Sequence, residues 1–142
     1  MKLYIGSDHA GFEMKEALKV WLLKNYTGIE VEDKGCDSEE SCDYADYAHA
    51  VAKSVNNDSR GILLCGSANG VSIAANKHAG VRAALCWTEE IATLARQHND
   101  ANILSIPARF VSLDVAEAMV KAFLDTPFEG GRHARRVEKI DL

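Results

Sequence analysis

A cysteine stands at the end of an apolar run near the middle of the chain. The segment from Leu63 to Lys77 reads Leu-Leu-Cys-Gly-Ser-Ala-Asn-Gly-Val-Ser-Ile-Ala-Ala-Asn-Lys. The run that ends at Cys65 is typical of a buried strand, and the residues after the turn are typical of a helix. Because a helix start favours the thiolate, this position predicts a lowered pKa for Cys65 and a role as general base or nucleophile. The alternative is a small buried apolar residue, as most free cysteines are.

The turn after this cysteine has the composition of an anion site. Its residues are small, which lets backbone N–H groups approach a ligand closely. The residues concerned are Gly66, Ser67, Ala68, Asn69 and Gly70. The turn is not a nucleotide-binding P-loop, because no Gly-Lys-Ser or Gly-Lys-Thr follows it.

A second polar turn, Gly6-Ser7-Asp8-His9-Ala10-Gly11, follows the first apolar segment. Asp8 and His9 stand where a carboxylate and an imidazole can contact a ligand as an acid–base pair. The alternative is that Asp8 caps the following helix and His9 lies on the surface. The glycine spacing does not match G-x-G-x-x-G, so the turn gives no support for a dinucleotide site.

Basic and imidazole side chains follow later in the chain. Arg96-Gln97-His98-Asn99-Asp100 closes an expected helix, whose C-terminus favours the charged form of His98. Arg109 follows the last expected strand, and Arg132 and Arg136 are spaced i, i+4, so they share a helix face and can clamp a phosphate. A solvated basic face is the alternative. Taken together, these residue types suit proton transfer on a small phosphorylated substrate, with no metal-ligand cluster and no nucleotide motif.

Strand-like and helix-like segments alternate along the chain. Strands are expected at 2–6, 29–33, 61–65, 81–86 and 101–106, with helices between them, Thr88 and Ser112 as N-caps, and a final basic helix at about 129–141. This alternation predicts an α/β fold, a single-domain three-layer α/β/α sandwich over residues 1–142 with a five-stranded parallel sheet. In such sheets the ligand lies outside the carboxyl ends of the strands, where the turns after Gly6, Cys65 and Pro107 lie.

Composition limits the classes of function. The chain has 142 residues, of which 47% are hydrophobic, and a formal net charge of −5, which argues against a nucleic-acid partner. The sequence shows no signal peptide and no apolar run long enough to span a membrane, so a cytoplasmic location is expected. The four cysteines match no zinc pattern, and reduced thiols are expected.

The chain resembles the B-type ribose-5-phosphate isomerases of the ribose/galactose isomerase family over essentially its whole length. The resemblance is carried by five segments: Gly6–Phe12, Asp43-Tyr44, Cys65–Lys77, Arg96–Asn102 and Glu129–Glu138. It implies a Rossmann-like fold, interconversion of D-ribose 5-phosphate and D-ribulose 5-phosphate in the pentose phosphate pathway, and no cofactor or metal. It also implies a homodimer or tetramer with active sites at the subunit interface, to which the C-terminal basic helix contributes.

The resemblance also implies residue roles. Cys65 stands where the family has its proton acceptor, and His98 where it has the proton donor for ring opening. Gly66 to Gly70 match the loop that holds the developing enediolate. Positions that match substrate and phosphate contacts are Asp8, His9, Asn99, Arg109, Arg132 and Arg136.

The chain departs from the family pattern inside the cysteine loop. Where the family usually has Cys-Gly-Thr-Gly, an apolar residue and Gly, this chain has Cys-Gly-Ser-Ala-Asn-Gly. Ala68 is unfavourable if the position requires a positive φ, and Asn69 places an amide near the substrate. Allose 6-phosphate and galactose 6-phosphate therefore stay open as substrates, and a non-catalytic sugar-phosphate-binding protein is the alternative from another class.

Overall fold

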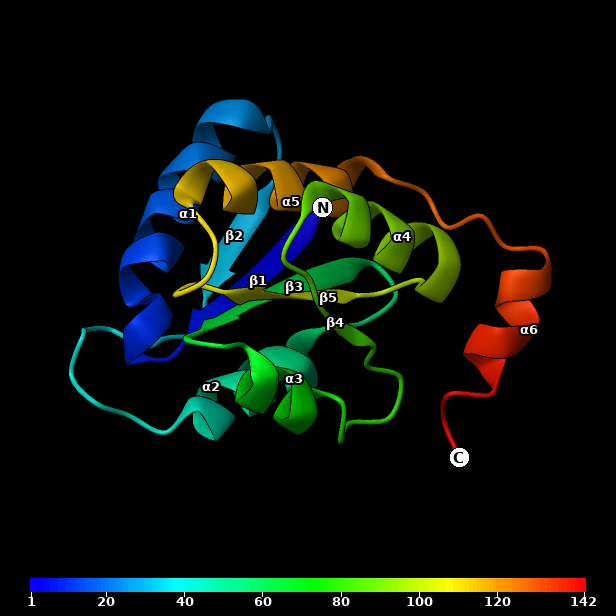
Figure 1. Ribbon diagram of the computed structural model, residues 1–142, viewed down its shortest axis with the longest axis horizontal. Helices are drawn as coiled ribbons and strands as arrows, with labels where there is room; N and C mark the ends of the chain where they lie inside the picture. The colour runs from blue at the N-terminus through cyan, green and yellow to red at the C-terminus, as the bar shows by residue number, and fades with distance from the viewer.

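Five parallel strands form the centre of the computed structural model, which describes residues 1–142 (Figure 1). The strands are β1 (Lys2–Ser7), β2 (Glu30–Asp33), β3 (Ser59–Cys65), β4 (Ala83–Leu85) and β5 (Ile103–Pro107), and their order in the sheet is β2-β1-β3-β5-β4. The expected five-stranded parallel sheet is thus confirmed, with boundaries shifted by one to two residues at most strand ends.

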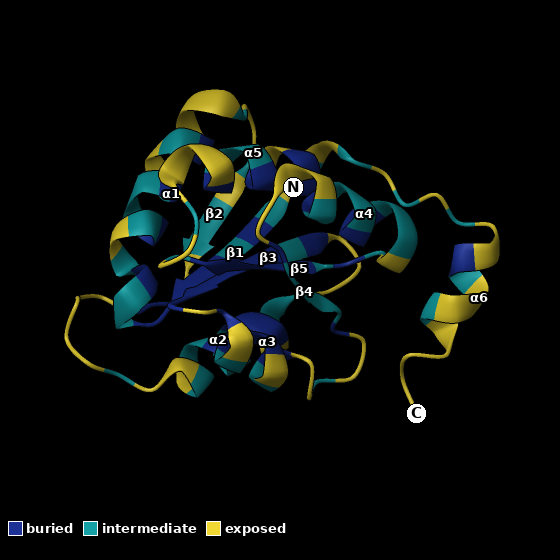
Figure 2. Cartoon of the chain, in the orientation of Figure 1, coloured by how far each residue is buried: buried dark blue, intermediate teal, exposed yellow.

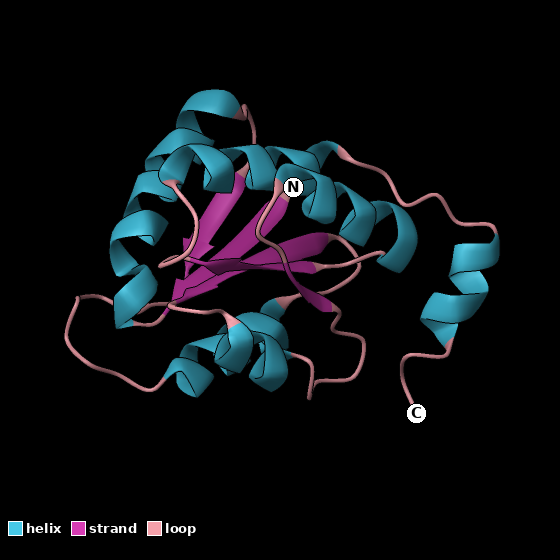
Figure 3. Cartoon of the chain, viewed as in Figure 1, coloured by secondary structure: helices cyan, strands magenta, loops and turns pink.

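Helices cover both faces of this sheet (Figures 1 and 3). One face carries α1 (Phe12–Asn25), α4 (Glu89–Asn99) and α5 (Leu113–Asp125), and the other carries α2 (Tyr44–Ser54) and α3 (Asn69–Ala75). This is the three-layer α/β/α sandwich that the alternating pattern predicts. Figure 2 shows the buried residues concentrated in the sheet and on the inner sides of the helices.

The strand residues divide between two cores because successive side chains point to opposite faces. On β3, Ile62 and Leu64 enter the core under α1, α4 and α5, whereas Leu63 and Cys65 enter the core under α2 and α3. Burying each such aliphatic side chain stabilises the fold by roughly 1.5–3 kcal/mol. Cys65 is therefore fixed by the packing of a central strand.

Side-chain caps fix where several helices begin. The hydroxyl of Thr88 accepts a hydrogen bond from the Ile91 N–H, and that of Ser112 accepts one from the Val115 N–H. Both caps are as expected from the sequence. A short 3₁₀ turn at His9–Gly11 precedes α1 and is capped by Asp8.

The last helix, α6 (Arg132–Glu138), lies apart from the two-faced sandwich (Figure 1). It is shorter than the expected 129–141, because Gly130 and Gly131 adopt positive φ values of 69° and 57° in the connection that leads to it. Its packing within the chain is against α4, and His133 is its only buried residue. None of the helices has the length and apolar character needed to cross a membrane.

Candidate active site

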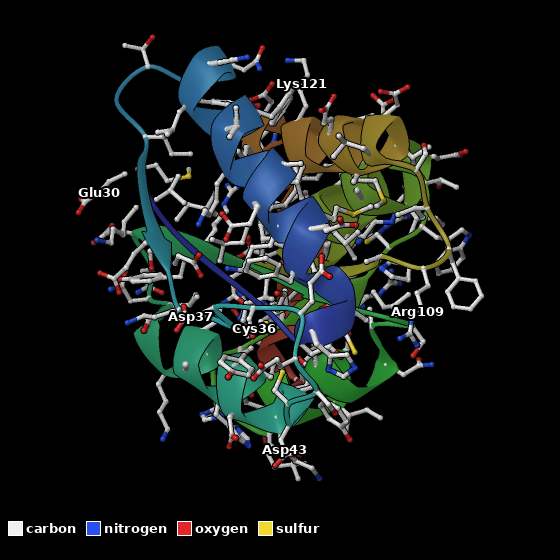
Figure 4. All side chains as sticks on the ribbon, turned by 90° about the vertical axis from the view of Figure 1, so that its left-hand side faces the viewer. Glu30, Cys36, Asp37, Asp43, Arg109 and Lys121 are labelled. Carbon is white, nitrogen blue, oxygen red and sulfur yellow. The ribbon has the colours of Figure 1, made fainter.

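The strand order reverses between β1 and β3, and two of the candidate residues lie at that point. The chain leaves β1 toward β2 on one side of the sheet and leaves β3 toward β5 and β4 on the other. Asp8 directly follows β1, Cys65 ends β3, and the Asp8 N–H donates to the Leu64 carbonyl at 3.2 Å. Ligands of open parallel sheets bind in the crevice at this switch point. Figure 4 views the molecule from this end of the strands.

The thiol of Cys65 and the carboxylate of Asp8 are hydrogen bonded in a buried setting. Cys65 Sγ donates to Asp8 Oδ2 at 3.4 Å, and the exposed fractions of the two residues are only 7% and 6%. The other oxygen, Asp8 Oδ1, accepts from the Gly11 N–H at 3.1 Å. Asp8 therefore caps the turn, as one of the two alternatives from the sequence has it, and also contacts the thiol.

Burial and the neighbouring Asp8 charge raise the pKa of Cys65 above its ordinary value. This contradicts the expectation of a lowered pKa. The backbone N–H groups of Ala68 and Gly66 do act on the sulfur in the lowering direction, but burial and the carboxylate outweigh them. The helix that follows is only seven residues long. In the single chain, burial first and the Asp8 carboxylate second therefore favour the neutral form of the thiol by raising its pKa.

The turn after Cys65 requires an unusual backbone conformation at Ala68. This residue has φ 65° and ψ 3°, in the left-handed region, and its side chain is fully buried. An alanine there costs about 1–2 kcal/mol relative to a right-handed conformation. The position therefore does need a positive φ, as the departure from the family's glycine suggested.

Two glycines of the turn allow other elements to approach closely. A Cβ on Gly66 would lie 3.1 Å from Arg109 Nη1, and a Cβ on Gly70 would lie 2.5 Å from the ring of Tyr44. Two backbone hydrogen bonds also hold the segment after β5 against the turn: the Ala108 N–H donates to the Cys65 carbonyl, and the Arg109 N–H donates to the Gly66 carbonyl. The Arg109 guanidinium is thus placed beside residues 66–70, the turn after Cys65, which we call the cysteine turn.

The segment between β2 and α2 completes this end of the molecule. The Cys42 N–H donates to His9 Nδ1 at 3.3 Å, and Cys36 Sγ lies 3.8 Å from Ser7 Oγ. Three residues of this segment, Cys36, Cys42 and Tyr44, were not assigned to the site from the sequence. The Asp43-Tyr44 pair among the matching segments was the one signal that pointed to this loop.

The remaining candidates gather around α6. A cavity of about 350 Å³ is lined by His98, Asn99, His133, Arg136, Val137 and Ile140. The rings of His98 and His133 stack with centroids 4.3 Å apart, and His98 Nε2 lies 3.6 Å from Glu129 Oε1. Burial is the main cause of a lowered pKa at His133, and the nearby charge of His98 adds to it. The sequence analysis gave no role to Glu129 or His133.

The atoms of His98, Glu129 and His133 include the types that bind zinc, but their present geometry does not suit a metal. Their ligand atoms lie within 4.8 Å of one another. The two imidazole planes, however, are inclined by only 10°. Since the ligating lone pairs lie in the ring planes, two nearly parallel stacked rings cannot both point at one ion. His98 and His133 instead form part of the wall of the cavity beside α6.

The two groups of candidates lie at opposite ends of the sheet. Cys65, Asp8 and Arg109 lie at the carboxyl ends of the strands, whereas α4 runs back from that end and carries His98 at its C-terminus. In Figure 1 the arrowheads of β1 and β3 point away from α6. A single chain therefore brings Asp8, His9, Cys65, the 66–70 turn and Arg109 together, and it does not bring His98, Asn99, Arg132 and Arg136 to them.

This fold and this site define a class of α/β protein, one that presents a buried thiol and a small-residue turn at the switch point of a parallel sheet. The model of the Ribose/Galactose Isomerase family matches residues 3–140, and the chain belongs to this family.

Relatives and solved structures of the same family match nearly the whole chain. Ribose-5-phosphate isomerase B of Escherichia coli K12 is 46% identical over 141 residues, which cover 98% of this chain and 93% of that protein. The crystal structure of a ribose 5-phosphate isomerase from Thermotoga maritima is 55% identical, with a TM-score of 0.94 and coverage of 99% and 97%. Ribose-5-phosphate isomerase B of Mycoplasma genitalium, solved with bound ribulose-5-phosphate, is 41% identical, with a TM-score of 0.92 and coverage of 98% and 93%.

Proposed function

We propose that this chain is an aldose–ketose isomerase that interconverts D-ribose 5-phosphate and D-ribulose 5-phosphate. The observation that carries the proposal is the Cys65 thiol beside the Asp8 carboxylate at the switch point, in a chain of the Ribose/Galactose Isomerase family. The similar proteins from Escherichia coli and Thermotoga maritima carry the name of this activity. We place the enzyme in the cytoplasm, where thiols stay reduced.

In the proposed reaction Cys65 moves a proton between C1 and C2 of the open-chain sugar. Deprotonation at C2, next to the C1 carbonyl, forms an enediolate. Return of that proton to C1 and transfer of the C2 hydroxyl proton to the C1 oxygen complete the isomerisation. The thiol proton has to leave first, and Asp8 Oδ2 already accepts a hydrogen bond from it. Asp8 thereby holds the sulfur in one orientation and also hinders its ionisation, because its charge raises the thiol pKa.

The turn from Gly66 to Gly70 is proposed to stabilise the negative charge of the enediolate. The N–H groups of Ser67 and Gly70 have no acceptor within the chain, and the turn is fixed by the positive φ of Ala68 and by the packing of Gly70 on Tyr44. A preorganised donor aimed at a developing oxyanion contributes roughly 3 kcal/mol to the rate. Ser67 and Asn69 contact each other through their side chains at 3.3 Å and form the outer wall of this turn.

Ring opening and phosphate binding are proposed to come from a second copy of the chain. His98, Asn99, Arg132 and Arg136 carry the donors these steps need, yet they lie at the far end of the sheet from Cys65. A homodimer in which α6 of one subunit reaches the cysteine turn of the other assembles the full set, with two sites per dimer. His98 then donates the proton that opens the sugar ring, and the arginines bind the phosphate alongside His9 and Arg109. The same arginines favour the thiolate of Cys65.

Mixing two inactive variants tests this arrangement. Cys65→Ala and His98→Ala are each purified, then unfolded and refolded together. In a dimer with shared sites, half of the refolded molecules are mixed and each holds one intact site, so activity returns to about a quarter of wild type. If every site were built from one chain, the mixture would stay inactive. Sedimentation of each variant checks that assembly is unaffected.

The reaction itself is tested by NMR of ribose 5-phosphate in D₂O with EDTA. We expect ribulose 5-phosphate with deuterium at the exchanging carbon. Allose 6-phosphate and galactose 6-phosphate serve as parallel substrates, and a higher kcat/KM for either would overturn the assignment of the pentose. Absence of turnover with all three sugars, together with retained binding, would instead support a binding protein.

A further inference from the structure

A second polar cavity lies at the amino ends of the strands, away from the cysteine turn. It has a volume of about 120 Å³ and is lined by no hydrophobic residue. Three of its residues are arginines, Arg60, Arg82 and Arg96, and only one is acidic, Asp100. The cavity therefore carries an excess of positive charge in a chain whose net charge is −5.

The single carboxylate is already used by two of the arginines. Arg96 Nη1 donates to Asp100 Oδ1 at 2.9 Å, and Arg82 Nη2 donates to Asp100 Oδ2 at 3.4 Å. Arg60 has no carboxylate partner. Its pKa is lowered to about 10, because it is partly buried and lies close to the charge of Arg96. Since buried charges are normally paired, this excess is compensated only incompletely within the chain.

Backbone carbonyls fix the arginines in place and leave donors free. Arg60 Nη1 donates to the carbonyls of Phe123 and Leu124, and Arg96 donates through Nε to Thr126 and through Nη1 to Ala101. Arg60 Nε and Nη2 and Arg96 Nη2 have no acceptor within the chain. These N–H groups belong to guanidinium groups that are already immobilised, so an anion would bind them with little loss of side-chain entropy.

From this geometry we propose that the cavity binds a phosphate-sized dianion at a site distinct from the isomerase site. Tetrahedral oxyanions suit planar guanidinium groups, which bind them with paired hydrogen bonds. The cavity is well below the roughly 300–1,000 Å³ of sites for drug-sized ligands, so it takes inorganic phosphate or the phosphoryl group of a small metabolite.

This site is separate from the cavity beside α6. The two cavities share no lining residue. Arg96 and His98 both belong to α4, but residues two apart project from nearly opposite sides of a helix. Arg96 accordingly reaches Thr126 beyond the end of α5, while His98 stacks on His133 of α6.

The test is an NMR titration of ¹⁵N-labelled protein with inorganic phosphate, at an ionic strength held constant with sodium chloride. We expect saturable shifts of the Arg60 Nε–H signal and of the backbone amides of Asn57 and Asp58. Shifts that stay linear, or that appear only around Arg132 and Arg136, would overturn the proposal. A parallel titration with glycerol 2-phosphate identifies the source: if the monoester binds as well, the ligand is a phosphorylated metabolite, and if phosphate alone binds, the ligand is the free ion.

A variant that adds a negative charge to the cavity provides a second test of phosphate binding. Arg60→Gln removes contacts to the end of α5 and endangers folding, so we choose Asn57→Asp, which adds a carboxylate at an exposed position of the cavity. We expect phosphate binding at the arginine signals to weaken at least about tenfold, because the new charge competes for the same donors. Asn25→Asp, an exposed change of the same kind at the end of α1, controls for net charge and should bind as wild type. Equal binding by both variants would overturn the proposal.

Discussion

The cysteine turn and the α6 region are built in opposite ways. The turn is enclosed: Cys65 and Ala68 are buried, Gly70 lies against Tyr44, and the segment after β5 is hydrogen bonded across it. Helix α6 follows two glycines in the left-handed region and has one buried residue. Both regions carry residues that the proposed reaction needs.

The two regions suit two different steps of the proposed reaction, proton transfer and phosphate binding. A base whose ionisation must be controlled requires burial and a fixed neighbour, which the sandwich supplies at its switch point. Binding a phosphate held at another subunit's site requires charged groups that reach beyond their own subunit, and an extending helix supplies them. The proposed homodimer joins the two, so each subunit contributes the cysteine turn to one site and α6 to the other. Substitutions in each region are therefore expected to change different kinetic parameters.

The largest expected effect is that of Cys65→Ala. Loss of a general base lowers kcat by about 10³-fold, within the range that positioned acid–base groups contribute. The measurement is kcat for ribose 5-phosphate, with substrate binding followed separately. The matched control is Cys86→Ala, which removes a fully buried thiol of the other core. Full activity in both variants would show that Cys65 is a packing residue only.

The pH dependence of the reaction is the next largest effect. A base acts when it is unprotonated, and the pKa of Cys65 is raised by burial and by Asp8. Below that pKa, kcat/KM is expected to rise about tenfold for each pH unit. Between about pH 6 and about pH 8, kcat/KM is therefore expected to increase about 100-fold. A flat profile over this range would exclude a raised thiol pKa in the working enzyme.

Asp8→Asn separates the two causes of that shift. The substitution removes the neighbouring charge and leaves the burial, so the pKa of Cys65 falls and the thiolate forms at lower pH. The ultraviolet absorbance of the thiolate is measured against pH, with Cys65→Ala subtracted as the blank. An unchanged titration would mean that burial alone sets the pKa.

The fold could be predicted from the sequence because its signals are local. The apolar periodicity of each segment and the caps at Thr88 and Ser112 gave five strands in a parallel sheet with helices on both faces. The rule for parallel sheets also predicted that the residues after β1 and β3 lie together, and the structure brings Asp8 and Cys65 into contact. The predicted positions of the strand ends were less accurate, because a strand ends where its backbone stops pairing with the neighbouring strands.

The electrostatics of the site could not be predicted in this way. The raised pKa of Cys65 depends on the distance to Asp8, 57 positions away in the sequence, and on burial between two layers. The stacking of His98 on His133 and the docking of Cys42 on His9 are likewise contacts between distant segments. The positive φ of Ala68 is the exception, because a glycine is usual at that position of the family and its replacement drew attention to the backbone.

Arg136→Ala tests whether α6 binds the substrate phosphate. Its expected effect on the kinetics is smaller than that of Cys65→Ala. The loss of a charge-assisted hydrogen bond to the phosphate, about 1.5–3 kcal/mol, is expected to raise KM about 10- to 140-fold and to change kcat less. Arg135→Ala is the matched control, because this exposed neighbour on the same helix does not line the cavity with His98. Equal effects of the two variants would mean that α6 contributes only general positive charge.

The smallest effect concerns the backbone of the cysteine turn and compares Ala68→Gly with Ala75→Gly. Both alanines are fully buried and belong to the same segment, but Ala68 is left-handed whereas Ala75 is helical. Each substitution loses a methyl group, about 0.8 kcal/mol, and gains unfolded-chain entropy, roughly 0.5–1 kcal/mol. Only Ala68→Gly also relieves about 1–2 kcal/mol of left-handed strain.

These contributions to stability nearly cancel in Ala68→Gly, whereas in Ala75→Gly the two losses add. We expect the free energy of unfolding of Ala68→Gly to stay within about 0.5 kcal/mol of wild type and that of Ala75→Gly to fall by about 1.5 kcal/mol. Urea unfolding of both variants with a common slope provides the measurement. Equal destabilisation would show that the turn tolerates alanine without strain. The predicted difference would show that the chain retains a strained residue three positions after its proposed base, in the turn that is proposed to stabilise the enediolate.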